Sequence, residues 1–169
     1  MNKVTVNKAI FSGMALLGAT LPLTAHASPT LPLDTHCTGT SVRVQIEGFK
    51  DRTGNVRVQA YGSNPDDFLA SGKKVVRVEG KTPSSGPVRV CVPLPAPGNY
   101  ALVVLHDRDM NGKLSVSKDG FGFSRNPKLG LGKPDYDEVR ITVGRGVSDI
   151  AVVLNYRRGL FAVGPLDKD

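Results

Sequence analysis

The chain has 169 residues, of which 40% are hydrophobic and 22% are charged, and its formal net charge is +7. This composition supports a folded core within one domain and excludes a disordered chain. Two cysteines exclude a four-cysteine zinc site. Lysine and arginine never occur in runs longer than two, so we expect no nucleic-acid partner, which would need a dense basic stripe.

The first 27 residues have the pattern of a secretory signal peptide. Lys3 and Lys8 give a basic start, an apolar run follows over 9–23, and Ala25–Ala27 offers small residues at the two positions that a signal peptidase reads. The run is shorter than the roughly 20 apolar residues of a bilayer-spanning helix. We therefore predict cleavage after Ala27, a periplasmic or secreted location and no transmembrane segment in the mature chain. A buried helix or an uncleaved membrane anchor is the alternative.

The body of the chain reads as short strands separated by turns. Apolar and polar residues alternate in most of these segments, and the segment 100–105 is almost continuously apolar, as expected of a central strand covered on both faces. No segment is followed by a crossover helix long enough for a parallel sheet. The pattern predicts an all-β domain over 40–156, an immunoglobulin-like or transthyretin-like sandwich of about seven antiparallel strands. The seven segments are 42–46, 56–60, 75–79, 88–92, 100–105, 139–143 and 150–154.

Three further segments complete the predicted organisation. A short helical turn is expected near 64–71, where Asn64 would be the N-cap and Pro65 the first helical residue. Residues 28–39 form an N-terminal lead-in. The tail 157–169 has no strand alternation, although its apolar part is able to cover an exposed sheet edge or contact a partner.

Cys37 and Cys91 are the only cysteines. Export would place them in an oxidising compartment, where disulfides form and persist. We therefore predict one bridge between them. Two free thiols are the alternative, and a redox role is not supported because the spacing is not Cys-x-x-Cys.

A possible cation loop follows the central strand. Asp107, Asp109 and Asn111 occupy positions 1, 3 and 5 of a D-x-D-x-N-G pattern, and Gly112 occupies position 6, where a calcium loop turns sharply. Hard cations prefer such oxygen ligands, so calcium is the candidate cofactor.

The rest of a calcium shell would come from the residues that follow. The carbonyl of Lys113 and the hydroxyl of Ser115 are candidate ligands. Position 12 is Lys118 rather than the usual glutamate, and Asp119 is the candidate replacement. The alternative is a self-capped turn, in which the Asp and Asn side chains bind nearby backbone amides.

Three segments together resemble a known family. They are His106–Asp107, Asn111–Leu114 and Gly120–Ser124, and over about 40–156 the chain resembles the bacterial exported proteins grouped as domain-of-unknown-function family 2141. The resemblance implies a small, exported, β-rich domain with no established activity.

His106, Phe121, Phe123 and Ser124 are candidate loop or ligand residues. We interpret Gly120–Ser124 as a segment that shapes the backbone, with glycines in tight turns and both phenylalanines gripping the end of the sandwich. Stacking of a ligand on the phenylalanine rings is the alternative.

The sequence therefore predicts a non-catalytic module of the cell envelope, monomeric or weakly associating. It would bind an unknown envelope protein or small ligand through the 106–135 loop region, where calcium is a candidate organiser. We assign no catalytic residue, since Ser124 lacks the G-x-S-x-G elbow. The alternative is a small periplasmic hydrolase-like enzyme that uses His106 and Asp109.

Overall fold

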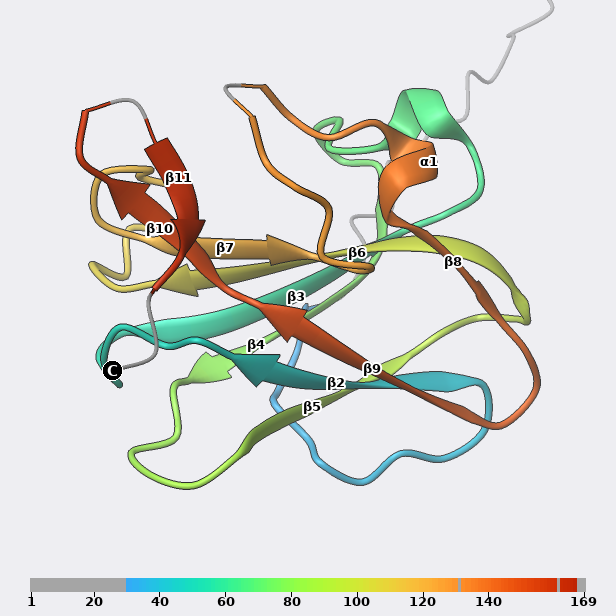
Figure 1. Ribbon diagram of the computed structural model, residues 1–169. Coiled ribbons are helices and arrows are strands. Elements are labelled where there is room, and N and C mark those ends of the chain that lie inside the picture. The colour runs from blue at the N-terminus through green and yellow to red at the C-terminus, as the bar shows by residue number, and fades with distance from the viewer. Residues whose placement is uncertain (1–29, 131, 161, 167–169) are drawn as a thin grey trace, which may run out of the picture.

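The computed structural model describes residues 30–130, 132–160 and 162–166, which fold into two β-sheets (Figure 1). The larger sheet has the strand order β1-β4-β3-β6-β7-β10-β11, with β8 also paired to β6, and the smaller sheet has the order β5-β2-β9. The predicted all-β class is thus confirmed. The predicted signal peptide lies outside the described residues. The strands are β1 (Thr30–Leu31), β2 (Ser41–Glu47), β3 (Asn55–Tyr61), β4 (Lys74–Lys81), β5 (Val88–Pro93), β6 (Gly98–Asp107), β7 (Gly120–Phe123), β8 (Arg140–Val143), β9 (Val147–Val153), β10 (Asn155–Arg158) and β11 (Ala162–Pro165).

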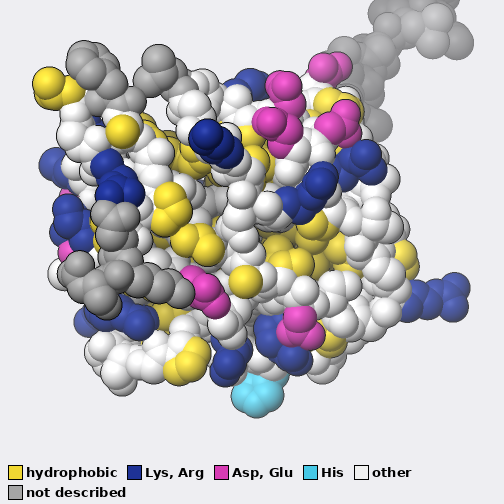
Figure 2. Space-filling view, in the orientation of Figure 1, with side chains coloured by type: hydrophobic (Ala, Val, Ile, Leu, Met, Phe, Trp, Pro, Cys, Tyr) yellow, Lys and Arg dark blue, Asp and Glu magenta, His cyan; other side chains and the backbone are white. Residues whose placement is uncertain are grey.

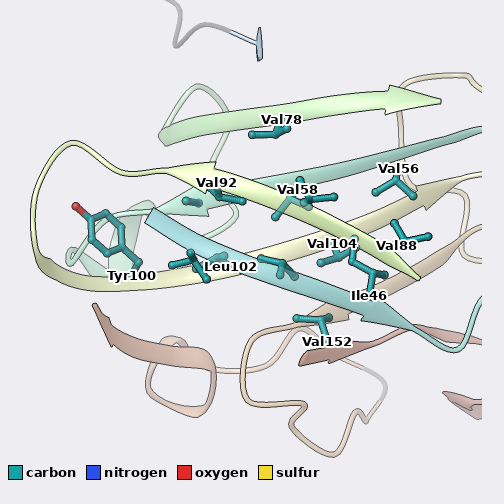
Figure 3. Close-up of a cluster of buried hydrophobic side chains, with 14 of the residues drawn as sticks. Ile46, Val56, Val58, Val78, Val88, Val92, Tyr100, Leu102, Val104 and Val152 are labelled. Carbon is teal, nitrogen blue, oxygen red and sulfur yellow. The ribbon is translucent and has the colours of Figure 1, made fainter. Parts of the chain in front are cut away.

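The main hydrophobic core lies between the two sheets. Every second residue of a strand points to the same face, so the alternating valines of the sequence turn inward together. Val58, Leu102 and Val104 of the larger sheet meet Ile46 and Val92 of the smaller one (Figure 3). The alternation that predicted these strands is therefore the pattern that builds the core.

The expectation of about seven antiparallel strands was wrong in two respects. The described residues form eleven strands. In addition, β2 pairs in parallel with β9, and the short β1 pairs in parallel with β4. The connection from β2 to β9 runs through most of the larger sheet, so the chain returns to the same end of the smaller sheet without a crossover helix.

The glycine-rich segment Gly120–Phe123 is a strand, not a set of tight turns. A side chain at Gly120 would place its Cβ 2.4 Å from Cζ of Tyr156, and one at Gly122 would lie 2.7 Å from the Val153 carbonyl oxygen. Glycines are thus required at these two positions of β7, because the Tyr156 ring and the Val153 backbone lie too close to leave room for a Cβ atom. This corrects our interpretation of their role.

Short helical segments flank the outer face of the larger sheet. The expected turn near 64–71 is a 3-10 helix, η1 (Pro65–Asp67), and the Asn64 side chain accepts a hydrogen bond from the Asp66 amide as an N-cap does. A second segment, α1 (Tyr136–Val139), was not predicted. Within the described residues, no helix has the length and hydrophobicity required to cross a bilayer.

The lead-in and the tail both join the folded body. Cys37 and Cys91 form the predicted disulfide, with 5.3 Å between their Cα atoms, and so tie the lead-in to β5. The tail, predicted to lack strands, forms the β10–β11 hairpin, whose first strand pairs with the edge of β7 at Asn155 and Phe121. Its apolar part therefore extends the larger sheet.

Candidate functional site

The loop that leaves β6 is organised by Asp107, the last residue of that strand. Its carboxylate is buried, 1% exposed, and accepts hydrogen bonds from two backbone amides. The Asn111 amide donates to Oδ1 at 3.2 Å and the Gly112 amide donates to Oδ2 at 2.8 Å. The sharp turn at Gly112, where φ is +75°, brings these amides back toward the strand end.

Asp119 closes the same loop from its far end. The side chain is fully buried, and it accepts hydrogen bonds from the Arg108 amide at 2.9 Å and from the Ser115 amide at 2.7 Å. A carboxylate from each end of the loop thus binds backbone amides inside it. Asp119, and not Lys118 at position 12 of the motif, is therefore the residue that closes the loop.

The other predicted ligands cap the turn between these two carboxylates. Oδ1 of Asn111 accepts from the Lys113 amide at 2.7 Å, and Nδ2 of Asn111 donates to Oγ of Ser115 at 2.9 Å. Asp109 is on the exposed side, where it accepts from the Asn111 amide at 3.3 Å and pairs with Nζ of Lys118 at 3.2 Å. These contacts are those of a self-capped turn.

The carboxylates also meet the first requirement of a cation site. One oxygen from each of Asp107, Asp109 and Asp119 lies within 4.8 Å of the others. Calcium takes six to eight oxygen ligands, and the Asn111 amide oxygen, the Ser115 hydroxyl and the Lys113 carbonyl are the remaining candidates in the loop. The residues fit a calcium ion by type, but the ion would compete with the backbone amides that the carboxylates now bind.

Arg57 ties the loop to the larger sheet. Its guanidinium donates to the Gly112 carbonyl at 3.0 Å, lies 3.7 Å from Oδ2 of Asp107, and forms an ion pair with Glu79 at 2.9 Å. Burial opposes ionisation of Glu79, but Arg57 and Arg77 outweigh it and hold the pKa of that carboxyl below its usual value. Sheet and loop therefore share one charged network.

His106 is buried and fully engaged. Nε2 lies 2.7 Å from the Thr53 carbonyl oxygen, which only accepts, so this nitrogen carries the proton. Nδ1 then accepts from the Tyr156 hydroxyl at 2.7 Å. Burial lowers the pKa of the imidazole below its usual 6.5. Both nitrogens are occupied, and Asp109 is on the exposed loop beyond the strand.

The remaining predicted residues divide between the interior and the surface. Ser124 is fully buried, where its hydroxyl accepts from the Leu102 amide at 3.0 Å and donates to the Val139 carbonyl. It therefore joins β6 to the end of α1. Phe123 packs in a second core with Phe68 and Tyr136, while Phe121 is partly exposed beside it.

Both phenylalanines also line a groove on the outer face of the larger sheet. The groove has a volume of about 670 Å³. Its floor includes Val103 and Leu105 of β6, which alternate with core residues and so point away from the core. Its walls come from residues 112–114 and 116, from 129–130 and 132–134, and from the β10–β11 hairpin. Figure 2 shows hydrophobic surface between this hairpin and the chain that leads from β7 to α1.

Sequence reasoning missed several residues of this groove. Arg57 and Arg77 come from β3 and β4, and Arg157 comes from β10, whereas Leu160 belongs to the apolar part of the tail that was expected to cover a sheet edge or contact a partner. One signal did point to it: the segment 100–105 is apolar on both faces, which predicted a cover on the outer face of the sheet. The cover is incomplete, and the groove is the part left open.

The fold and site define a small all-β domain with an Asp/Asn loop at one end of its larger sheet and an apolar groove on that sheet's outer face. The chain belongs to the family described as "Uncharacterized protein conserved in bacteria (DUF2141)", which it matches over residues 44–151. The predicted resemblance is thus confirmed. No curated protein and no solved structure gives a significant match to the chain.

Proposed function

We propose that this protein is an exported, non-catalytic module of the cell envelope that binds a small ligand or a partner through its 106–135 region. The observation that carries the proposal is the groove, because about half of its lining comes from residues 112–134. Loops on a rigid sheet scaffold are a common place for binding functions.

We further propose that the two sheets are an immunoglobulin-like or transthyretin-like sandwich.

Two features support export. The leader pattern of residues 1–27 is that of a signal peptide. The Cys37–Cys91 disulfide is of a kind that persists in oxidising compartments. If the proposal is right, the protein recovered from the periplasm or medium begins at Ser28, as N-terminal sequencing would show. A precursor retained in the cytoplasm with its leader attached would contradict export.

The geometry favours binding over hydrolysis. A histidine base must reach its substrate, and the ring of His106 is 0% exposed with both nitrogens bonded. Ser124 is likewise buried and bonded to the backbone. Of the two residues on which the hydrolase alternative depends, His106 is therefore used to hold strands together, and Asp109 lies on the exposed loop, where it pairs with Lys118.

Site-specific photocrosslinking tests the proposed binding surface. A photoreactive amino acid at Leu114, which is exposed and lines the groove, is compared with one at Arg89, which is exposed on β5 of the smaller sheet. In intact cells we expect a defined adduct from position 114 and none from position 89. Equal adduct patterns from both positions, or none from position 114, would overturn the assignment of this face.

Calcium binding by the 107–119 loop is a second candidate function, favoured by the convergence of three carboxylates. We expect millimolar calcium to raise the melting temperature, because an ion that binds only the folded state stabilises it. The rise should disappear in Asp109→Ala, which removes an exposed ligand and leaves the buried Asp107 and Asp119 in place. Calorimetry without heat and an unchanged melting temperature would leave the self-capped turn as the complete description of the loop.

A further inference from the structure

We propose that the groove binds a single-chain anionic amphiphile: an alkyl chain that carries one carboxylate or phosphate group. The inference rests on the proposed binding function and names the chemical class of its ligand. It follows from the size of the groove, from the chemistry of its lining and from the charges that surround it.

The size of the groove indicates a small molecule. Its volume of about 670 Å³ falls within the roughly 300–1,000 Å³ typical of ligand pockets. Its walls come from three separate segments that enclose part of the sheet face, whereas a protein partner generally meets a broad and flatter surface. The occupant we infer is therefore a ligand that enters the fold.

The floor of the groove is apolar. Floor residues include Val103, Leu105 and Phe121, and Gln59 is the one uncharged polar side chain among the described lining residues. A sugar placed over this floor would lose hydrogen bonds to water without finding replacements there, at considerable cost. An alkyl chain has no such groups to satisfy.

Exposed hydrophobic side chains concentrate at the same place. Six large hydrophobic residues are exposed in the described chain, and four of them line the groove. Exposed apolar side chains that cluster beside a groove mark a binding site more often than scattered ones do. The four are Leu69, Leu114, Val116 and Leu160.

The charged side chains that line the groove are all basic. Its described lining contains five basic residues and no acidic one. Arg57 and Arg77 share the carboxylate of Glu79, which offsets part of their charge. Lys113, Lys133 and Arg157 remain, all exposed, and none forms an ion pair with an acidic residue of the described chain. Three cations beside an apolar floor complement a ligand with one anionic end.

Calorimetry with the purified mature protein at low salt tests the inference. The probes are octanoate, decanoate and dodecanoate, with monododecyl phosphate as a second head group and dodecyltrimethylammonium as a cation of matched chain length. We expect binding of the anions to tighten about fourfold per added methylene until the chain fills the groove. We expect the cation to bind at least about tenfold more weakly than dodecanoate.

Variants locate the binding. The double change Lys113→Gln and Lys133→Gln should weaken dodecanoate about tenfold and tighten binding of the cation, while leaving the melting temperature unchanged. Lys81→Gln, at an exposed lysine of β4 outside the groove, is the matched control and should change nothing. The two dodecyl anions, compared in the same variants, show whether carboxylate or phosphate is preferred.

Several outcomes would overturn the inference. They are equal affinity for the anion and the cation, no dependence on chain length, or equal effects of the groove and control variants. The broader proposal is distinguishable from it. A specific adduct at position 114 together with no dodecanoate binding would refute the amphiphile and keep the binding surface, whereas no adduct and no dodecanoate binding would refute both.

Discussion

The hydroxyl of Tyr156 donates to Nδ1 of His106 at 2.7 Å, which joins β10 to β6 across the strand that separates them in the sheet. The same hydroxyl accepts from the Lys50 amide at 3.1 Å. The tyrosine ring reaches this position because Gly120 of β7 has no side chain in its way. The position of the Tyr156 ring thus depends on both of its neighbours: it hydrogen-bonds His106 of β6 and occupies the space left by Gly120 of β7.

The pH dependence of stability should show this buried pair. Burial lowers the pKa of His106 in the folded state below 6.5, so below that pH the unfolded chain binds more protons than the folded one. We therefore expect the free energy of unfolding to be greatest above about pH 7 and to fall as the pH drops toward about 5. Urea unfolding followed by circular dichroism at a series of pH values measures this.

A matched pair of variants assigns the effect to the histidine. His106→Gln removes the titration while keeping a donor and an acceptor, and it should flatten the slope between about pH 7 and pH 5. His36→Gln changes an exposed histidine and should leave the slope as it is. A wild-type profile that is flat over this range would contradict the burial argument.

Gly120→Ala should destabilise the protein. The added methyl group would lie 2.4 Å from Tyr156 Cζ, so the ring must move and strain the hydrogen bond to His106. We expect a loss of about 1–3 kcal/mol in the free energy of unfolding, as for other overpacked interiors. Gly144→Ala is the control, since nothing lies within 4 Å of its added Cβ. Equal urea midpoints for the two variants would show that β7 tolerates side chains at this position.

The strands with two-residue periodicity could be predicted from sequence because burial on one face imposes that pattern directly. Strands β2 to β5 belong to this group, whereas β6 was recognised by an almost continuous apolar run. Strand β7 could not be recognised in this way, since two of its alternate positions are glycines. A side chain at either position would clash with Tyr156 or Val152. The parallel partnership of β2 and β9 also left no local signal, because it joins segments about a hundred residues apart.

The same distinction between local patterns and long-range contacts applies to the candidate site. The Asp/Asn loop is local, so its sequence alone named Asp107, Asp109 and Asp119, whose carboxylates converge in the structure. The groove is assembled from β3, β4, β6, β7, three loops and the tail. Its basic residues are far apart in the sequence, and only the fold brings them around one apolar floor.

The Cys37–Cys91 bridge should contribute substantially to stability. It joins residues 54 apart, and in the chain-entropy account such a crosslink stabilises by about 4 kcal/mol. We expect the Cys37→Ser, Cys91→Ser double variant to unfold at a correspondingly lower urea concentration, in the absence of reductant. Reductant should lower the midpoint of the wild type and leave that of the double variant unchanged. Two titratable thiols in unfolded, unreduced wild-type protein would show that the bridge does not form.

Asp107 should prove more important for folding than Asp109, although both belong to the same predicted motif. Asp107 is buried, binds two amides and faces the Arg57 guanidinium, so Asp107→Ala would leave these groups without their partner. We expect a loss of about 2–3 kcal/mol, measured by urea unfolding without calcium. Asp109→Ala removes an exposed carboxylate paired with Lys118 and should change stability little. Equal losses in the two variants would mean that the loop is held by the motif as a whole, not by its buried end.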